Sequence, residues 1–322
     1  MGLSLDEGAH IVIDRWCRVQ PGERLLIISD ECHVAESMAL WRAADCCGAE
    51  AVLLTIQEGA SHAGSIFQSM SEFVLRNDVI IGATNFSLIT NRITREVLAK
   101  GGRFLSLPLS TNNGQPALSF AFMDMDPGEA ERTGRGMLEV LRRAQRVRVT
   151  TALGTDLVFG KRGRDPGLFT GLADRPGKAG SSSFEIYIGI EESVTSGRAV
   201  VDGSLGYLGR PDAPIPLVFR NGRLVDISGE AGEKLRRYMN SFEDLGIYVA
   251  GELGIGLNKI SRCEGNCYIE DESAFTTFHI GMGRNLALGG VHDAAGHFDL
   301  VFKFPTIYAD DTLIMRDGLP VV

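Results

Sequence analysis

The stretch RLLIIS, at Arg24–Ser29, places four apolar residues in a row near the start of the chain. An apolar run of this length is typical of a strand that is covered on both faces, as in a parallel sheet. Similar runs follow as AVLLTI, DVIIGAT and RFLSLPL, at 51–56, 78–84 and 103–109. Helical segments are expected between these runs, at 41–47, 62–76 and 87–100. The alternation predicts an α/β domain built on a doubly wound parallel sheet.

The pattern changes after a helix that is expected to start at Asp126-Pro127 and to end near Gln145. Aspartate can cap this helix, proline suits its first position, and Glu129 completes a capping box. Because 322 residues are too many for one compact core of usual size, two domains are expected. We predict an α/β domain over 1–145 and a β-rich α+β domain that binds metal over 146–322.

Strand and turn signals dominate the second part. SFEIYIGI, at 183–190, alternates with a period of two, and a hairpin is expected to turn near Gly154-Thr155. Asn221-Gly222 lies between two strand-like runs, which is the strongest short-range signal for a hairpin. One helix is expected over 230–242. The segment 163–182 is rich in Gly, Pro and Ser and is expected to be a surface loop.

Composition excludes several classes of partner. The chain has 32 Lys and Arg against 41 Asp and Glu, a formal net charge of −9, so neither nucleic acid nor an anionic membrane is expected as a partner. The N-terminal residues are not expected to act as a signal peptide, and no window approaches the roughly 20 apolar residues of a membrane span. Six cysteines in this length are no disulfide framework, so we expect a cytoplasmic protein.

Common catalytic motifs are missing from the sequence. Ser29-Asp30-Glu31-Cys32 follows the first strand without a glycine that would admit a pyrophosphate, and there is no Walker A sequence. No GxSxG nucleophile elbow is present either. Nucleotide binding and serine hydrolase chemistry are therefore not expected.

Metal-ligand residues gather in the second part instead. His297 and Asp299 form an HxD pair, and residues i and i+2 of a strand project from the same face. His279 lies far enough upstream to sit on a neighbouring strand, and Glu252 follows an apolar run at an expected strand end. Two imidazoles and two carboxylates suit Zn²⁺, Mn²⁺, Co²⁺ or Fe²⁺ better than Ca²⁺ or Mg²⁺.

Each of these residues also has a structural interpretation, which the spacing leaves open. A single histidine in a β-rich domain is often a hydrogen-bonded structural residue, and Glu252 alone could be a solvated acid in a turn. His292 and Asp293, between glycine-containing turns, are expected in an exposed loop. The acids at 270–272 could be a solvated run, or could place one carboxylate beside a metal.

The order of motifs resembles that of the aminopeptidase T family of metallopeptidases. The motifs are FEIYIGIEES, PIPLVFRNGRLVDISG, GELGIGLN, EDESAFTTFHIGMGRN and the HxD pair. The resemblance implies an exopeptidase, usually a dimer, with two divalent ions, Zn, Co or Mn. Its implied metal ligands are Glu185, Glu252, His279, His297 and Asp299. Two such ions would activate a water for hydrolysis, with Glu270 or Glu272 as general base, and we favour Glu272.

Two departures from that family favour an alternative. The family carries a tyrosine seven residues after its first ligand histidine, where this chain has Leu286, and its members are typically longer. The sequence also resembles the iron-dependent 2,5-dihydroxypyridine ring-cleaving dioxygenases, which use two histidines and one carboxylate. His279, His297 and Asp299 satisfy that count, with Fe(II) as the metal.

Our prediction from the sequence is a metal-dependent aminopeptidase, a hydrolase acting on a short peptide or another small molecule as a homodimer. The alternative is an Fe(II)-dependent ring-cleaving dioxygenase. A third hypothesis is a non-catalytic binding protein that kept the fold. Metal content separates the first two, because one iron indicates oxygen chemistry and two zinc, cobalt or manganese ions indicate hydrolysis.

Overall fold

The computed structural model describes residues 2–57 and 66–322. Its internal contacts divide the chain into two compact units. Unit 1 comprises Met1–Pro127 and Phe169–Ser183, and unit 2 comprises Gly128–Leu168 and Phe184–Val322.

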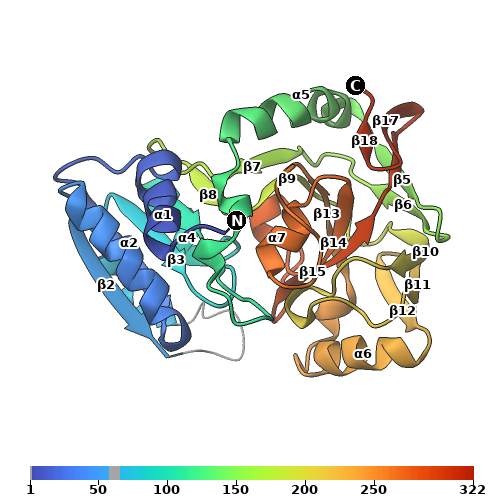
Figure 1. The fold of residues 1–322 in the computed structure, drawn as a ribbon. Coiled ribbons are helices and arrows are strands. Elements are labelled where there is room, and N and C mark those ends of the chain that lie inside the picture. Colours follow the sequence, from blue (N-terminus) through green and yellow to red (C-terminus); the bar gives the residue numbers. More distant parts are fainter. Residues whose placement is uncertain (1, 58–65) are drawn as a thin grey trace. The chain divides into compact units, whose positions relative to one another are not determined.

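Unit 1 is built on a five-stranded parallel sheet of order β2-β1-β3-β4-β8 (Figure 1). Its strands are β1 (Arg24–Asp30), β2 (Glu50–Ile56), β3 (Val79–Ala83), β4 (Arg103–Ser106) and β8 (Ala179–Ser181). The chain passes from β1 outward to β2 and then back across β1 to β3. Because such crossovers are right-handed, the reversal puts successive helices on opposite faces, which is the predicted doubly wound arrangement. The fold class predicted from the sequence is confirmed.

The helices of unit 1 cover strands that are apolar on both faces. They are α1 (Leu5–His10), α2 (Val34–Cys46), α3 (Ile66–Val74) and α4 (Arg92–Ala99). Ser4 and Glu7 form a capping box at the start of α1, a helix that the sequence patterns did not predict. Gly48 follows α2 with a φ of +80°, as expected for a residue that ends a helix. Residues 62–65 of the predicted helix 62–76 lie outside the described residues.

Unit 2 contains two sheets with antiparallel pairing (Figure 1). The first has the order β12-β11-β10-β6-β5-β16-β17-β18. Its strands are β5 (Arg146–Thr150), β6 (Asp156–Gly160), β10 (Ser196–Val201), β11 (Ile215–Arg220), β12 (Arg223–Ile227), β16 (Thr306–Ala309), β17 (Thr312–Arg316) and β18 (Leu319–Pro320). Asn221 and Gly222 both have positive φ, 49° and 81°, which matches the hairpin predicted between β11 and β12.

The second sheet has the order β15-β14-β13-β9-β7. Its strands are β7 (Gly167–Thr170), β9 (Phe184–Gly189), β13 (Ala250–Gly256), β14 (Thr277–Gly283) and β15 (His297–Lys303). The helices of unit 2 are α5 (Pro127–Arg143), α6 (Glu233–Asn240) and α7 (Tyr268–Ser273). Short 3-10 turns precede α6 and β13 at Glu230–Gly232 and Leu245–Tyr248.

The segment 163–182 is not simply the predicted surface loop, because it contains β7 and β8. These strands have only four and three residues, and their glycines and serines hide them from pattern analysis. Glycine is required at position 180 of β8, because a Cβ there would lie only 2.7 Å from the Leu172 carbonyl oxygen.

The boundaries of the two units also differ from a single division after residue 145. Helix α5 belongs almost entirely to unit 2. Its Gly134 lies against apolar side chains of that unit, and a Cβ there would meet Leu257 Cδ1 at 2.9 Å and Ile186 Cδ1 at 3.5 Å. The amphipathic pattern of a helix shows that one face is buried, but not against which strands.

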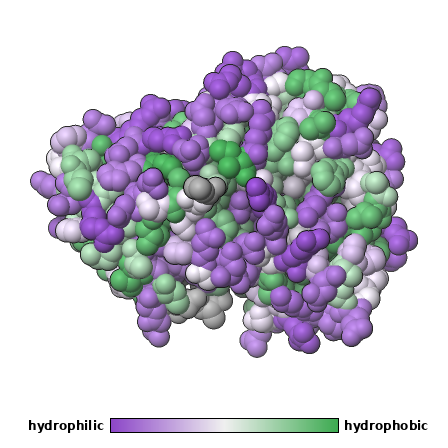
Figure 2. Space-filling model, viewed as in Figure 1, coloured by the Kyte–Doolittle hydropathy of each residue, from purple (hydrophilic) through white to green (hydrophobic). Residues whose placement is uncertain are grey.

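Hydrophilic residues cover most of the face shown in Figure 2, and hydrophobic residues occur there in small groups. Within the described residues, no helix is both long enough and apolar enough to cross a membrane.

Candidate metal centre

The second sheet of unit 2 is buried on both faces, and its two faces differ in chemistry. On β14, Phe278, Ile280 and Met282 point to one side, and Phe278 stacks on Phe302 of β15 with 4.6 Å between the ring centroids. The alternate residues carry polar side chains or none. The set on this second face is Glu185, Glu252, His279, His297 and Asp299, none more than 8% exposed. One face therefore builds the core, and the other carries every predicted metal ligand.

Strand register places a glycine beside each of these side chains. Glu252 of β13 lies opposite Gly281 of β14, and Asp299 of β15 lies opposite the same Gly281. His279 is opposite Gly254, and Glu185 of β9 is opposite Gly256. Glycine leaves open the space that a cross-strand side chain would fill.

The glycines are required by these close approaches. A Cβ on Gly254 would lie 1.8 Å from His279 Nε2 and 2.1 Å from its Cε1, a severe overlap with the ring. A Cβ on Gly281 would lie 2.7 Å both from Glu252 Oε2 and from His297 Cε1. The sequences AGELGIG and FHIGMG thus supply both the ligand side chains and the glycines that leave room for them.

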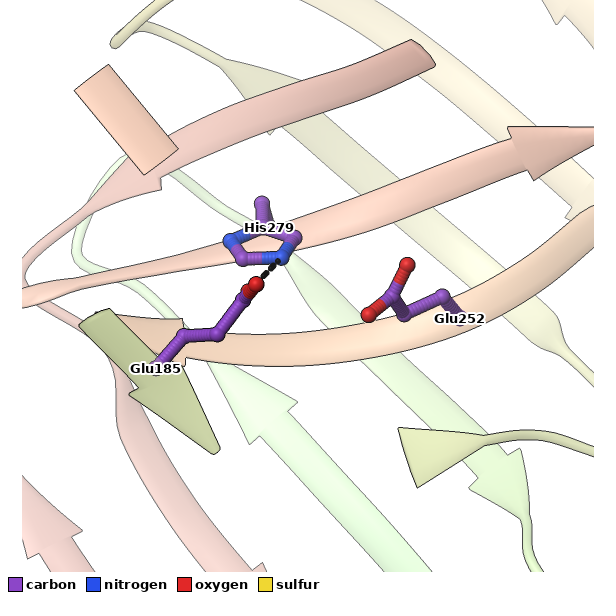
Figure 3. A group of neighbouring side chains, drawn as sticks. All are labelled: Glu185, Glu252 and His279. Carbon is purple, nitrogen blue, oxygen red and sulfur yellow. Dashed lines mark ion pairs between the residues drawn. The ribbon is translucent and has the colours of Figure 1, made fainter. Parts of the chain in front are cut away.

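Two groups of side chains could each hold a metal ion within the described residues. Glu185, Glu252 and His279 form one group, and Glu252, His297 and Asp299 form the other. In each, one possible ligand atom per residue lies within 4.8 Å of the rest. Figure 3 shows the first group converging from β9, β13 and β14. Glu252 belongs to both groups, so the five residues form one continuous cluster.

Short contacts link the imidazoles to the carboxylates. His279 Nε2 lies 2.8 Å from Glu185 Oε2 (Figure 3), and His297 Nε2 lies 3.1 Å from Glu252 Oε2. His297 Nδ1 lies 2.7 Å from the carbonyl oxygen of Arg284. That carbonyl can only accept, so Nδ1 carries a hydrogen, and Nε2, which faces the carboxylates, is the nitrogen that would ligate a metal after losing its own proton. This tautomer is the one that a metal ligand requires.

Burial and mutual charge shift the pKa values of the cluster strongly. Burial opposes ionisation of Glu252 and Glu272, and together with the neighbouring Asp299 and Glu185 carboxylates it raises the pKa of both acids. Although burial disfavours a charged imidazole, Glu185 raises the pKa of His279 to about 9. Four carboxyl groups thus share a buried space with two imidazoles, an arrangement that a divalent cation stabilises.

Unpartnered atoms agree with such a cation. In the part of the chain that the structure describes, Asp299 Oδ1 and Glu272 Oε2 are buried without a hydrogen-bond partner. Buried polar atoms nearly always have partners, and each exception requires an explanation. Nitrogen and carboxylate donors together suit a transition metal, so the residues present fit one.

The three acids at 270–272 have different surroundings. All belong to α7 and are buried, so they are not a solvated run. Glu270 accepts a hydrogen bond from the backbone N–H of Arg262 at 3.2 Å, away from the cluster. Glu272 lies close enough to the carboxylates of Asp299, Glu185 and Glu252 for their charges to raise its pKa. Of the two candidate bases, Glu272 is therefore the one beside the cluster.

His292 and Asp293 lie outside the metal-binding groups, as expected for loop residues. His292 Nε2 is 2.9 Å from the carbonyl oxygen of Gly246, and Asp293 pairs with Arg284 at 2.8 Å. Tyr268, by contrast, was missed by the sequence patterns. Its hydroxyl donates a hydrogen bond to Asp299 Oδ2. Tyr268 and Glu272 are four residues apart on one helix, a spacing that could have placed both on the same side.

The fold and the cluster define a class of proteins that join a doubly wound α/β unit to a β-rich unit with a candidate metal centre. The chain belongs to the 2,5-dihydroxypyridine 5,6-dioxygenase family, whose model matches residues 14–322. No curated protein matches the sequence significantly.

Two solved structures share the fold over nearly the whole chain. The 2,5-dihydroxypyridine dioxygenase from Pseudomonas putida KT2440 has a TM-score of 0.80 at 18% identity, covering 99% of this chain and 97% of that one. AmpT from Thermus thermophilus has a TM-score of 0.66 at 16% identity, covering 99% of each chain. At these identities, both comparisons establish the fold alone.

The family match overturns the predicted hydrolase. The prediction of an aminopeptidase, and with it of a metalloprotease, was wrong, and the dioxygenase alternative is the better supported. The error has a physical cause. Both resemblances depend on the same buried histidines and carboxylates, so the order of the motifs does not separate hydrolysis from oxygen chemistry. Leu286, where the peptidases have a tyrosine, was the departure that pointed away from them.

Proposed function

We propose that this protein is an Fe(II)-dependent dioxygenase that opens the ring of a small dihydroxylated N-heteroaromatic compound of the 2,5-dihydroxypyridine type. The observation that carries the proposal is the family match over residues 14–322, in a chain whose His279, His297 and Asp299 are buried in two ligand groups that share Glu252. Homodimerisation stays a prediction.

His279, His297 and Asp299 are the proposed iron ligands, since two histidines and one carboxylate are the usual set of non-haem Fe(II) oxygenases. When bound, iron supplies the redox chemistry with O₂ that imidazoles and carboxylates lack. The neighbouring Glu185 and Glu252 lie 2.8 and 3.1 Å from the Nε2 atoms of His279 and His297, so their carboxylates are on the side of each imidazole that would face the ion. Because Glu185 and Glu252 are two carboxylates more than a three-residue iron site needs, the number of metal ions bound per chain should be measured directly.

Glu272 is the proposed proton-handling group. It is 5% exposed and lies against Asp299, yet it belongs to neither metal-binding group. A carboxyl group in that place can hold the proton of a ring hydroxyl while the substrate is bound. Addition of both atoms of O₂ across the C5–C6 bond opens the ring without an external reductant, so oxygen and substrate are consumed one to one.

The test is oxygen uptake by the purified protein after anaerobic loading with Fe(II). With 2,5-dihydroxypyridine we expect one O₂ consumed per substrate and loss of the absorbance of the aromatic ring. His297→Ala should abolish uptake, whereas His292→Ala, which changes a histidine outside the cluster, should retain it. Hydrolysis of an aminoacyl amide without oxygen uptake would refute the proposal.

A further inference from the structure

We propose that Tyr268 is a positioning residue for the metal centre, which turns the Asp299 carboxylate so that one of its oxygens faces the cation. The inference rests on Asp299 acting as a ligand in the proposed function. Tyr268 hydrogen-bonds Asp299, and its effect acts through that carboxylate.

The hydrogen-bonding of Asp299 differs between its two oxygens. Oδ2 accepts a hydrogen bond from the Tyr268 hydroxyl, and both side chains are almost fully buried. Oδ1 has no hydrogen-bond partner among the described residues and lies 3.5 Å from His297 Nε2. A carboxylate whose one oxygen is held in this way presents the other as a single, directed ligand. The free oxygen belongs to the group that contains Glu252 and His297.

The phenol ring is held in place by packing. Tyr207 stacks on Tyr268 with 4.1 Å between ring centroids and 17° between ring planes. Tyr207 lies in a segment that pairs with β15, because Val301 N–H donates to the carbonyl oxygen of Ser204 at 2.9 Å. Val301 is two residues beyond Asp299 on that strand. The ring and the ligand are thus attached to the same part of the sheet.

Gly206 makes this packing possible. Its φ is +61°, and a Cβ there would lie 3.0 Å from the backbone oxygen of Asp299 and 3.5 Å from Tyr268 Cε2. A larger residue in this conformation would be strained and would press on both groups. The segment can therefore close over the ligand strand, and the hydroxyl has little freedom to leave Oδ2.

A phenol also suits the charge of the site. A hydrogen bond from a neutral donor to a carboxylate is stronger than one between neutral groups, and it fixes the carboxylate well. An arginine or lysine in the same place would bring a positive charge that competes with the metal ion. Tyr268 orients the ligand and leaves its negative charge for the cation.

The experiment measures metal binding by the metal-free protein, with Co(II) as a probe that absorbs visible light. We expect Tyr268→Phe to raise the Kd for Co(II) by about 10- to 100-fold, the usual cost of removing a partner of a metal ligand. The Co(II) absorption band should also change, because the orientation of Asp299 changes. The matched control is Tyr248→Phe, which removes a phenol hydrogen bond to Asn240 Oδ1 of 2.8 Å outside the cluster.

An unchanged Kd and spectrum in Tyr268→Phe would overturn the inference, even if both variants lose the same thermal stability. If Tyr268→Phe does not fold, Tyr207→Leu keeps the hydroxyl and removes the stacked ring. Several-fold weaker binding there supports the inference, and unchanged binding overturns it. Failure of the wild-type protein to bind Co(II) overturns the metal centre together with this inference. The Co(II) titration uses neither substrate nor O₂, so its result does not depend on dioxygenase activity. A lack of that activity would therefore contradict only the proposed function.

Discussion

The central strands of the two units, which Figure 1 labels β1, β3, β13 and β14, differ in the side chains that their faces carry. In unit 1, the apolar side chains of β1 and β3 point to both faces of the sheet, and the whole of β3 is buried. In unit 2, β13 and β14 are equally buried. There, however, apolar side chains occupy one face, and the other carries a metal-ligand residue and two glycines on each strand.

The difference separates residues that build a fold from residues that serve a reaction. Burying apolar side chains stabilises β1 and β3 by about 25 cal/mol per Å² of buried area. Burying a carboxylate costs free energy unless it is paired or binds a cation. Glu252 and Asp299 therefore do not stabilise the sheet more than apolar residues in their places would. A buried strand that places an ionisable residue and glycines on one face is therefore the sharper sign of function.

The largest effect is expected when a glycine is replaced on the polar face. In Gly254→Ala the new Cβ would overlap the His279 ring, with Nε2 at 1.8 Å, so the imidazole must move away from its place in the cluster. We expect metal affinity to fall by more than about 100-fold, beyond the loss from a missing partner of a ligand. Titration with Co(II) measures it.

The matched control is a buried glycine in the sheet of unit 1. In Gly82→Ala of β3 the new Cβ would meet Leu88 Cδ1 at 2.8 Å, the movable end of a flexible side chain. We expect a change in unfolding free energy within about 1–3 kcal/mol and no change in metal affinity. Equal loss of metal affinity in both variants would show that the comparison between the sheets is wrong.

The parallel sheet of unit 1 could be predicted from the sequence because each central strand is an apolar run of its own. Strands β7 and β8, of four and three residues, could not, because strands this short form only where a distant strand pairs with them. The division into units was equally hidden. The sequence of α5 does not show whether its buried face packs against Leu257 and Ile186 of unit 2 or against the parallel sheet of unit 1, because that choice depends on contacts between distant residues.

The ligands were predictable to the extent that local spacing places them. His297 and Asp299 share a face at a spacing of two residues, and His279 and Glu252 stand in recognisable strands. Glu185 followed only from resemblance, because its place opposite Gly256 depends on the register of β9 and β13. The choice of reaction was not predictable from these residues, since the same ligands accompany hydrolysis and oxygen chemistry.

The second prediction concerns metal loading, which should stabilise the sheet of β13 and β14 in unit 2 more than the parallel sheet of unit 1. At a metal concentration about 100 times the Kd, the folded site gains about 2.7 kcal/mol. Amide hydrogen exchange should therefore slow by about 100-fold for core amides of β13 and β14 whose opening breaks the site. Exchange in β1 and β3 should change much less. Equal slowing in both sheets would mean that they open as one cooperative unit, contrary to the comparison.

The smallest expected effect is a dependence of stability on pH that has opposite signs in the two units. Burial raises the pKa of Glu270 and of Asp271 to about 7. Their stabilising contribution is fully present below their unfolded pKa values and is lost as pH rises through about 7. In unit 1, hydrogen bonding to Arg24 lowers the pKa of Asp78 instead. Its contribution is present above its unfolded pKa and is lost as pH falls.

Urea unfolding of the metal-free protein at pH 5 and pH 8 tests this sign. Between these values we expect the wild-type protein to lose on the order of 1 kcal/mol for each of the two acids of unit 2. Glu270→Gln keeps the acceptor for the Arg262 N–H, which Glu270 Oε1 provides, but cannot ionise. It should therefore reduce the loss, whereas Asp78→Asn should leave it unchanged, because Asp78 is ionised at both pH values. If Glu270→Gln and the wild-type protein lose the same free energy, burial of this acid in α7 is not what sets the pH response of unit 2.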